Sequence, residues 1–392
     1  MSIPAGSKSG YVPPLINLNL NYYEFAENFI NIAQKYELYK IKTIGIYIND
    51  LCNLNCKHCY YTRKNTLNKN LAPINTLVNF LRKSILQNVK LFAFVGKEIF
   101  LPGTDIGERT IKLMKFLSTE KKKHQILIGA VTNGTKINLF INQLKQLNIN
   151  YIDFSIDGPD PKSHEALRGK NTFKITISNL ERSVKEKIAE KIFIASTLYQ
   201  GNLNSLSKII HLGNNLGVSN FNINPIVAIK GDHLAINISN LATFINQICE
   251  ESQKTNSKNL ILFDLDSYLV PKLLPLTPFH DEKIKIDALN NILLIKKEGK
   301  TEIVLKISPP DPCNSYACVS ADGLYFDKGG CLFMENNYEE KSLGPINPEI
   351  IHKHEQKTLE IYKLLNSSLL NASSDETLTK IEGVKYVLPK IN

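Results

Sequence analysis

The chain has 392 residues, of which 43% are hydrophobic and 21% are charged, so it can build one large domain with additions, or two domains. No run of about 18 apolar residues occurs, so we expect no membrane-spanning helix, and the start of the chain lacks the apolar stretch of a secretion signal. The net charge is +10, but the lysines are spread along the chain and no aromatic-glycine RNA-binding signature is present. We therefore do not expect nucleic acid to be the partner.

The seven cysteines form two groups of three and one single residue, Cys249. A secreted disulfide framework does not have this pattern in so long a chain. Thiolates that bind metal fit better, and they need a reducing compartment, so we predict a cytoplasmic protein. Cys249 lies beside Ile248 on a predicted helix and is expected in the core.

The N-terminal part of the chain predicts one helix over residues 22–36 and then a regular alternation of strands and helices. From about residue 43, short apolar runs alternate with segments of helical periodicity, which predicts β/α units around a parallel sheet. The expected strands are residues 43–49, 91–95, 126–131, 151–156, 191–198 and 217–227. Among the intervening helices, one begins at Pro73 and another covers about residues 137–147. Six units predict an α/β fold, a partial (β/α)6 barrel of the TIM type, with its chemistry at the carboxyl ends of the strands.

The pattern changes after residue 230. A helix over 238–252 and an apolar run over 260–263 precede a predicted hairpin, whose strands 292–296 and 302–307 flank a turn at Gly299. The dipeptide Asp322-Gly323 predicts a second turn between two short strands, and a last helix is expected over 354–370. The predicted regions are an N-terminal helical segment (1–42), the barrel (43–230), a linker helix and hairpin (231–310), a cysteine-containing region (311–335) and a helical tail (336–392).

The first cysteine group, Cys52, Cys56 and Cys59, follows the first barrel strand, at the edge where chemistry is expected. Its spacing, three and then two intervening residues, lets three thiolates bind three irons of a [4Fe–4S] cluster. No fourth cysteine lies nearby, so one iron is left open. Clusters of the ferredoxin type bind all four irons to protein, whereas an open iron lets a small molecule coordinate. A zinc site or a group of buried thiols is the alternative interpretation.

The segment from Asn49 to Tyr60, Asn-Asp-Leu-Cys-Asn-Leu-Asn-Cys-Lys-His-Cys-Tyr, resembles the signature loop of the radical S-adenosylmethionine superfamily. The resemblance implies that Cys52, Cys56 and Cys59 hold a catalytic [4Fe–4S] cluster. It further implies reductive cleavage of S-adenosylmethionine to a 5′-deoxyadenosyl radical, which abstracts hydrogen from an unactivated carbon. His58 stands where the family has an aromatic residue, and we expect it to line the cofactor site.

Two strand ends resemble cofactor-binding positions of the same superfamily. After the second strand, Gly96 and Glu98 match two positions of a Gly-Gly-Glu-Pro motif that binds the amino group of the methionine moiety, whereas Lys97 and Ile99 differ. After the third strand, Asn133 lies in a Thr-Asn-Gly turn similar to one that shapes the cofactor pocket. A purely structural turn is the alternative for Asn133.

The fourth strand end gives a further match. Ser155-Ile-Asp-Gly, then His164, then Arg168-Gly resembles a pattern of the peptide- and protein-modifying branch. The resemblance implies that Ser155 and Arg168 contact the ribose and the methionine carboxylate of the cofactor. A guanidinium suits this task because its planar fork directs two donors at one carboxylate.

The second cysteine group, Cys313, Cys318 and Cys331, has four and then twelve intervening residues. It is similar to the auxiliary-cluster hairpin of the SPASM and twitch extensions, and it gives region 311–335 a twitch-like character. A full SPASM domain has more cysteines, so the resemblance implies a single auxiliary [4Fe–4S] cluster. Its fourth ligand would be substrate, another residue or water. A structural zinc site is the alternative.

These motifs together resemble maturases of ribosomally synthesised peptides, which crosslink, epimerise or excise parts of a precursor peptide. We therefore predict a radical S-adenosylmethionine enzyme that acts on a precursor peptide, splicease-like reactions included, with flavodoxin or ferredoxin as electron donor. Only 42 residues precede the first barrel strand, fewer than the fused leader-binding domain of the resembling family needs. A separate small leader-binding protein of the RRE type is accordingly the expected partner.

The alternative function is that of a small-molecule enzyme resembling GTP 3′,8-cyclase, which also combines a radical cluster with a C-terminal group of three cysteines. That family ends in Gly-Gly, whereas this chain ends Leu-Pro-Lys-Ile-Asn. Its C-terminal cysteine pair is also spaced by two residues, whereas four separate Cys313 from Cys318.

Overall fold

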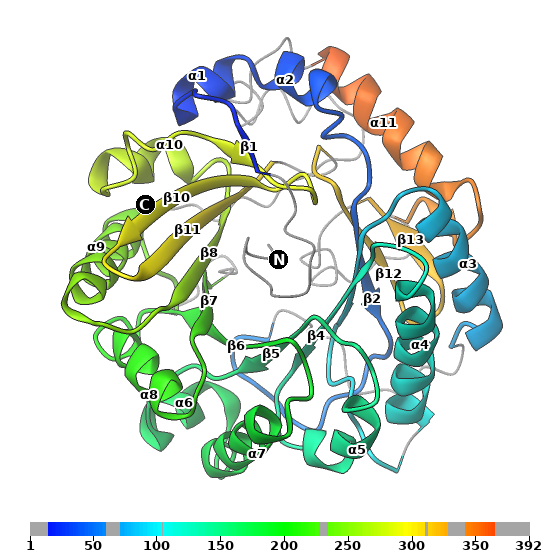
Figure 1. Ribbon diagram of the computed structural model, residues 1–392, viewed down its shortest axis with the longest axis horizontal. Helices are drawn as coiled ribbons and strands as arrows, with labels where there is room; N and C mark the ends of the chain where they lie inside the picture. Colours follow the sequence, from blue (N-terminus) through cyan, green and yellow to red (C-terminus); the bar gives the residue numbers. More distant parts are fainter. Residues whose placement is uncertain are drawn as a thin grey trace.

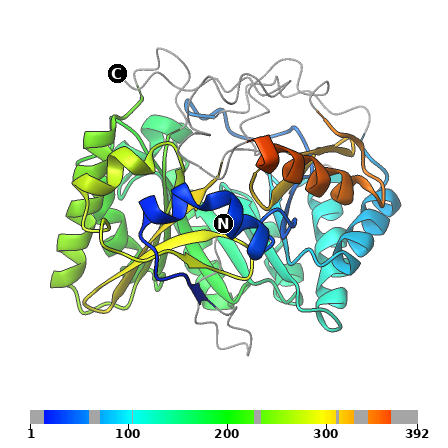
Figure 2. The same ribbon diagram turned by 90° about the horizontal axis from the view of Figure 1, so that it is seen from above.

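The computed structural model describes residues 15–59, 71–103, 105–226, 234–309, 313–327 and 342–364. In these ranges a curved sheet forms an incomplete ring, and helices surround it on the outside (Figures 1 and 2). No helix in the described ranges is both long enough and apolar enough to span a membrane.

The sheet is built mainly from parallel strands. In chain order these are β2 (Thr43–Tyr47), β3 (Leu91–Val95), β4 (Leu127–Thr132), β5 (Tyr151–Ser155), β6 (Lys191–Leu198), β7 (Asn220–Pro225), β8 (Leu260–Asp266) and β11 (Thr301–Ser308). Each pairs in parallel with the next. The α/β class and the partial, open barrel are confirmed, and all six predicted barrel strands are present. The parallel run is longer than predicted because β8 and β11 continue it.

Antiparallel strands extend both edges of the sheet. They are β1 (Ile16–Asn17), β9 (Lys285–Ile286), β10 (Ile292–Glu298), β13 (Leu324–Phe326) and β14 (Gly344–Pro345), while β12 (Tyr316–Val319) pairs in parallel with β2. The two predicted turns are confirmed, with Gly299 and Gly323 at φ of 59° and 86°, where glycine is favoured. The sheet therefore crosses the region boundaries predicted at residues 230 and 310.

Helices of very different length cover the outside of the sheet. The α-helices are α1 (Tyr22–Glu27), α2 (Phe29–Lys35), α3 (Ile74–Leu86), α4 (Asp105–Lys121), α5 (Ile141–Leu144), α6 (Pro161–Arg168), α7 (Phe173–Glu186), α8 (Ile209–Asn215), α9 (Ile238–Lys254), α10 (Val270–Leu273) and α11 (Ile350–Leu364). Three 3-10 turns accompany them, η1 (Ile137–Leu139), η2 (Leu206–Lys208) and η3 (Leu274–Leu276).

Two helix predictions were wrong in length. The helix expected over residues 22–36 is divided into α1 and α2 at Asn28, whose side chain donates to the carbonyl of Glu24 at 2.9 Å. Such a local bond competes with a continuous helix. The helix expected over 137–147 is a 3-10 turn followed by a single α turn, yet it still buries Ile137, Phe140 and Ile141 as the apolar spacing predicted.

The two faces of the sheet have separate cores. Outward side chains such as Phe92 and Phe94 are fully buried beneath the helices, and each contributes about 1.5–3 kcal/mol by its burial. Inward side chains form smaller apolar clusters. One of these, which includes Tyr151 and Phe193, lies at the amino ends of β5 and β6. Another, which includes Tyr47 and Val95, lies at the carboxyl ends of β2 and β3.

Gly129 on β4 provides a test of this inner packing. A β-carbon at this position would collide with the ring of Tyr151, which also packs edge-on against Phe193. Gly129→Ala should therefore lower the free energy of unfolding by about 1–3 kcal/mol, measured by urea denaturation. Combination with Tyr151→Leu, which removes the ring, should recover part of the loss. A fully stable Gly129→Ala protein would contradict the packing described.

Candidate functional site

The loop that follows β2 carries the first cysteine group and is tied to the end of β3. The Asn49 side chain donates to the carbonyl of Glu98 at 2.8 Å and accepts from the amide of Leu51 at 2.6 Å. The Glu98 amide in turn donates to the carbonyl of Leu51 at 3.0 Å. The start of the loop is therefore fixed by the neighbouring strand.

Two further contacts hold the middle of this loop. The Asn53 side chain donates to the hydroxyl of Thr135, after β4, at 2.8 Å. The Lys57 amide donates to the carbonyl of Leu167, in the last turn of α6, at 2.9 Å. The cysteine loop thus depends on three separate strand–helix units for its position.

The three cysteines differ in exposure. Cys52 and Cys56 are half-buried and Cys59 is exposed. The amide of Leu54 and the side-chain amide of Asn133 donate to the Cys52 sulfur at 3.4 and 3.8 Å. Burial raises the pKa of the Cys52 thiol to about 11 and also raises that of Cys56. Without a metal these thiols are therefore protonated, and a bound metal would displace their protons.

The donor set fits an iron–sulfur cluster. In the described ranges no three His, Cys, Asp or Glu side chains converge on a single metal ion. A cluster does not require such convergence, because each thiolate binds a different iron. Three thiols on one loop, with N–H groups directed at the Cys52 sulfur, match the ligands and the sulfur hydrogen bonds that such clusters use.

Glu98 joins the ends of β3 and β4. Its side chain is fully buried. One carboxylate oxygen accepts from the Thr132 hydroxyl at 2.8 Å and from the Phe100 amide at 3.0 Å, and the other accepts from the Asn133 amide at 2.7 Å. Burial raises the pKa of Glu98, although these donors oppose the shift. Glu98 therefore shapes the turn after β4, and its predicted contact with the cofactor amine stays a prediction.

Gly96, the other predicted residue at this strand end, has a φ of 114°. L-residues rarely adopt this conformation, and a β-carbon would press on the ring of Tyr47. The backbone needs glycine here irrespective of any cofactor.

Asn133 contacts the cysteine loop. Its side-chain amide donates to Asn53 at 3.0 Å as well as to the Cys52 sulfur, and its oxygen accepts from the amide and hydroxyl of Thr135. The turn after β4 is therefore part of the wall around the cysteines.

Ser155 and Arg168 lie at the next strand end. Ser155 is the last residue of β5 and is 9% exposed, and Arg168 ends α6. Burial opposes the charge of Arg168, but Asp157, Cys56 and Cys52 together raise its pKa. The structure thus brings a largely buried cation to the side of the cysteine loop.

Asp157 is a residue that the sequence motif contained but to which no role was assigned. Its carboxylate accepts from Arg168 Nε at 2.6 Å and from the Thr197 amide at 2.8 Å, and His58 Nε2 lies 3.7 Å away. The Asp157 amide donates to Nδ1 of the fully buried His164 at 3.3 Å. Its place in the Ser-Ile-Asp-Gly motif, with a cation eleven residues later, is the signal that could have indicated this pairing.

The second cysteine group is described only in part. Cys313 packs in the outer core, where the Tyr362 hydroxyl donates to its carbonyl at 2.9 Å. Cys318, on β12, packs on the inner face of the sheet. The inner cluster consists of Tyr47, Ala93, Val95, Cys318 and Phe326. The structure thus places Cys313 and Cys318 in separate packing clusters, and Cys331 lies outside the described residues. Cys249 is 4% exposed and in the outer core, as predicted.

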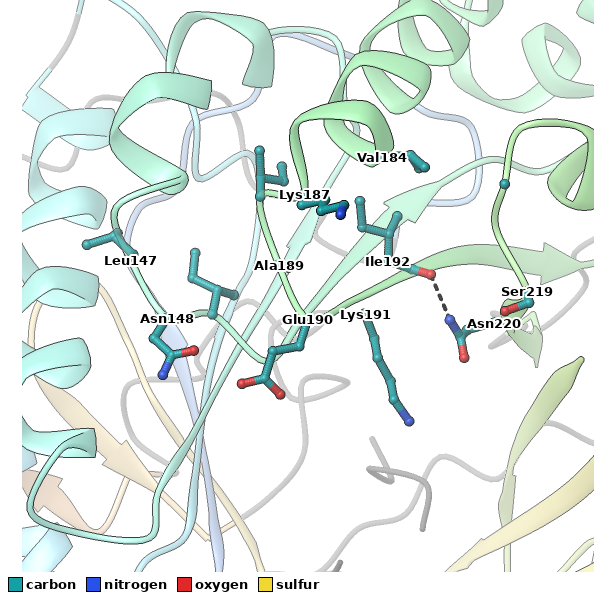
Figure 3. Close-up of a pocket in the computed structure, with 13 residues that line it drawn as sticks. Leu147, Asn148, Val184, Lys187, Ala189, Glu190, Lys191, Ile192, Ser219 and Asn220 are labelled. Carbon is teal, nitrogen blue, oxygen red and sulfur yellow. Dashed lines mark hydrogen bonds between the residues drawn. The ribbon is translucent and has the colours of Figure 1, made fainter. Parts of the chain in front are cut away.

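A cavity of about 550 Å³ lies at the opposite end of the sheet (Figure 3). Its lining comes from the amino ends of β5, β6 and β7 and includes Glu190, Lys191 and Asn220; the Asn220 side chain donates to the Ile192 carbonyl at 3.2 Å. In barrels of this kind the amino ends contribute to stability, while chemistry belongs at the carboxyl ends. This cavity is therefore not the candidate active site.

Comparison with known proteins assigns the segment that contains the cysteine loop to a known family. Residues 46–210 match the family model of the Radical SAM superfamily, a range that begins in β2, ends in α8 and includes all three cysteines of the loop. These residues form a radical SAM domain.

Curated relatives are distant and differ in their names. The chain is 22% identical over 303 residues to a probable GTP 3′,8-cyclase from Methanococcus aeolicus, covering 73% of this chain and 97% of that protein. It is 24% identical to the GTP 3′,8-cyclase of Vibrio vulnificus, with 46% of this chain and about half (54%) of that protein covered. It is also 27% identical to the radical SAM cyclopropyl synthase TigE of Paramaledivibacter caminithermalis, over 41% of this chain and 36% of TigE.

Two solved structures have the same fold. Streptococcus suis SuiB bound to S-adenosylmethionine superposes with a TM-score of 0.60 at 12% identity, covering 87% of this chain and 74% of SuiB. The enzyme anSMEcpe with bound AdoMet gives 0.56 at 14% identity, covering 86% of this chain and 96% of anSMEcpe.

The buried His164 predicts a pH dependence of stability. Burial, followed by the charge of Arg168, lowers the pKa of His164 to about 4 from an ordinary 6.5. Between these values the unfolded chain binds the extra proton, so acid favours unfolding, and this histidine should cost about 2 kcal/mol of stability between pH 7 and pH 5.

Urea unfolding at both pH values tests this expectation. His164→Asn, which keeps an acceptor for the Asp157 amide, should reduce the loss on acidification. The exposed His211 provides the control, since His211→Asn should leave the loss unchanged. Equal pH dependence in the parent and His164→Asn proteins would show that His164 titrates normally.

Proposed function

We propose that the protein cleaves S-adenosylmethionine reductively and uses the resulting radical to modify a ribosomally synthesised precursor peptide. The main evidence is the loop with Cys52, Cys56 and Cys59, which lies at the carboxyl end of β2 within a radical SAM domain. When bound, the [4Fe–4S] cluster supplies the electron that releases the 5′-deoxyadenosyl radical. The protein residues bind and orient the cofactor and exclude water.

Roles for the surrounding residues follow from their positions at neighbouring strand ends. Arg168 is proposed to hold the methionine carboxylate, since its charge lies beside the cysteine loop. Ser155, at the end of β5, is proposed to hold the ribose. Gly96 and Glu98 are proposed to form the wall at the methionine amine, and His58 and Asn133 the wall beside the cluster.

The proposal of a peptide substrate is supported by two solved structures of the same fold. SuiB bound to its precursor peptide SuiA has a TM-score of 0.59 and covers 91% of this chain and 70% of SuiB at 11% identity. The structure of anSMEcpe with bound AdoMet and the Cp18Cys peptide has a TM-score of 0.56 at 15% identity, and covers 86% of this chain and 95% of anSMEcpe. Crosslinking, epimerisation and excision all stay open as outcomes.

A second candidate is the chemistry of a GTP 3′,8-cyclase. It is favoured by the Methanococcus aeolicus relative, whose whole length is nearly covered. The low identity to that protein leaves the substrate class to experiment.

The proposed partners are an electron donor of the flavodoxin or ferredoxin type and a separate leader-binding protein. The described N-terminal residues pack on the barrel. The Tyr22 hydroxyl donates to the carbonyl of Ser267 at 3.0 Å, and the rings of Phe29 and Tyr362 lie edge-on at 5.6 Å.

The proposal includes a twitch-like auxiliary [4Fe–4S] cluster on Cys313, Cys318 and Cys331. It requires Cys313 and Cys318, now in separate packing clusters, to face one site. The iron content of the reconstituted protein tests for this auxiliary cluster separately from the first cluster.

Replacing Cys52, Cys56 and Cys59 together by alanine should abolish 5′-deoxyadenosine formation, because the cofactor then has no cluster to accept electrons from. Anaerobically reconstituted protein should contain about eight irons per chain with two clusters and about four with one, and the triple variant should contain about four fewer. Cys249→Ala is the control, since Cys249 is a core residue. Continued cleavage by a folded triple variant would refute the assignment.

Mass spectrometry with candidate substrates tests the second half of the proposal. The reconstituted enzyme should change the mass of a precursor peptide encoded beside it. Mass loss would indicate excision, loss of two hydrogens crosslinking, and deuterium uptake alone epimerisation. Turnover of GTP with no change in the peptide would instead establish the cyclase alternative.

A further inference from the structure

Asp157 is a fully buried carboxylate that joins three elements of the site. Its Oδ2 accepts from Arg168 Nε, at the end of α6, at 2.6 Å, and its Oδ1 accepts from the Thr197 amide, on β6, at 2.8 Å. His58, on the cysteine loop, lies 3.7 Å from Oδ2. A buried charge is costly unless it is paired and hydrogen-bonded. These contacts therefore offset the cost of burying the carboxylate of Asp157.

The pairing with Arg168 keeps Asp157 ionised. Burial alone would raise the pKa of this carboxyl, but Arg168 first, and then His58 and the Thr197 amide, hold it below its ordinary value. Arg168 in return has its pKa raised chiefly by Asp157. The two side chains therefore form a buried ion pair.

Hydrogen bonds to both the side chain and the backbone hold Asp157 in this position. Besides the Thr197 contact, its carbonyl accepts from the Asn202 side chain at 3.0 Å and its amide donates to His164 at 3.3 Å. Backbone and carboxylate are thus both fixed. The orientation of the guanidinium of Arg168 is therefore set by the ends of β5 and β6.

The ion pair uses only one edge of the guanidinium. Asp157 contacts Nε, and the two terminal nitrogens of Arg168 make no hydrogen bond with the part of the chain that the structure describes. Two terminal N–H groups on one planar edge can hold a carboxylate with two parallel hydrogen bonds. The preceding residue, Leu167, accepts from the cysteine-loop amide of Lys57 at 2.9 Å, so this edge lies next to the proposed cluster.

We propose that Asp157 is a positioning residue, which orients Arg168 so that its terminal nitrogens bind the carboxylate of S-adenosylmethionine. This inference rests on the proposed roles of Arg168 and of the cysteine loop. It separates two properties: affinity for the cofactor depends on Asp157, while assembly of the cluster does not.

The test compares two buried aspartates of the same segment. In reconstituted full-length protein, Asp157→Asn should weaken the dissociation constant for S-adenosylmethionine by roughly tenfold or more, because the charge that holds Arg168 is lost. Iron content and the cluster's absorption spectrum should not change. Asp153→Asn is the matched control, since Asp153 on β5 is 2% exposed but contacts Asn222 and not Arg168; it should bind the cofactor like the parent.

A double-mutant cycle tests whether Asp157 acts through Arg168. In an Arg168→Ala background, Asp157→Asn should cause little further loss of affinity, because both changes remove the same contact. Arg168→Lys keeps the ion pair but removes the fork, so it should weaken binding without disturbing folding. Should Asp157→Asn fail to fold, Asp157→Glu takes its place, since it keeps the charge but shifts the carboxylate by one methylene and should also weaken binding.

The outcomes distinguish this inference from the proposal on which it rests. Undiminished affinity in Asp157→Asn, an equal loss from Asp157→Asn with and without Arg168, or iron loss specific to Asp157→Asn would overturn the positioning role alone. Undiminished affinity in both Arg168→Ala and Arg168→Lys would overturn the proposed role of Arg168, and the inference with it.

Discussion

Parallel pairing of β2, β3, β4 and β5 brings four strand ends to one edge of the sheet, and the candidate site depends on this alignment. Tyr47 of β2 is opposite Val95 of β3, and Thr132 of β4 is opposite Phe154 of β5. The loops that leave these strands must therefore meet. The cysteine loop is held by its neighbours through hydrogen bonds to Glu98, Thr135 and Leu167.

Two buried carboxylates convert this alignment into a rigid site. Glu98 binds the turn after β4 with both of its oxygens, and Asp157 binds the ends of α6 and β6. Each charge is tolerated because N–H or O–H groups satisfy it, and each would be costly if a partner were lost. Glu98 lies at the proposed methionine amine site, and Asp157 supports the proposed methionine carboxylate site.

The sequence predicted most of the fold, and it located the cysteine loop after the first barrel strand, because both depend on local patterns. The alternation of apolar runs identified six strands, and the loop from Asn49 to Tyr60 identified the cysteines. The contributions of β8 and β11 were missed, since pairing across long connections leaves no local signal. The break at Asn28 depends on a single side chain–backbone bond. The pairing of Asp157 with Arg168 arises from the geometry of α6 relative to β5, and the placement of Cys318 on the inner face follows from its register with Gly45.

Electron paramagnetic resonance of the reduced, reconstituted protein tests the central claim most directly, namely that Cys52, Cys56 and Cys59 leave one iron open for S-adenosylmethionine. We expect a signal of a reduced [4Fe–4S] cluster that shifts when S-adenosylmethionine is added, and we expect this shifting signal to disappear when the three cysteines are replaced. A reduced cluster whose signal does not respond to the cofactor would contradict the claim.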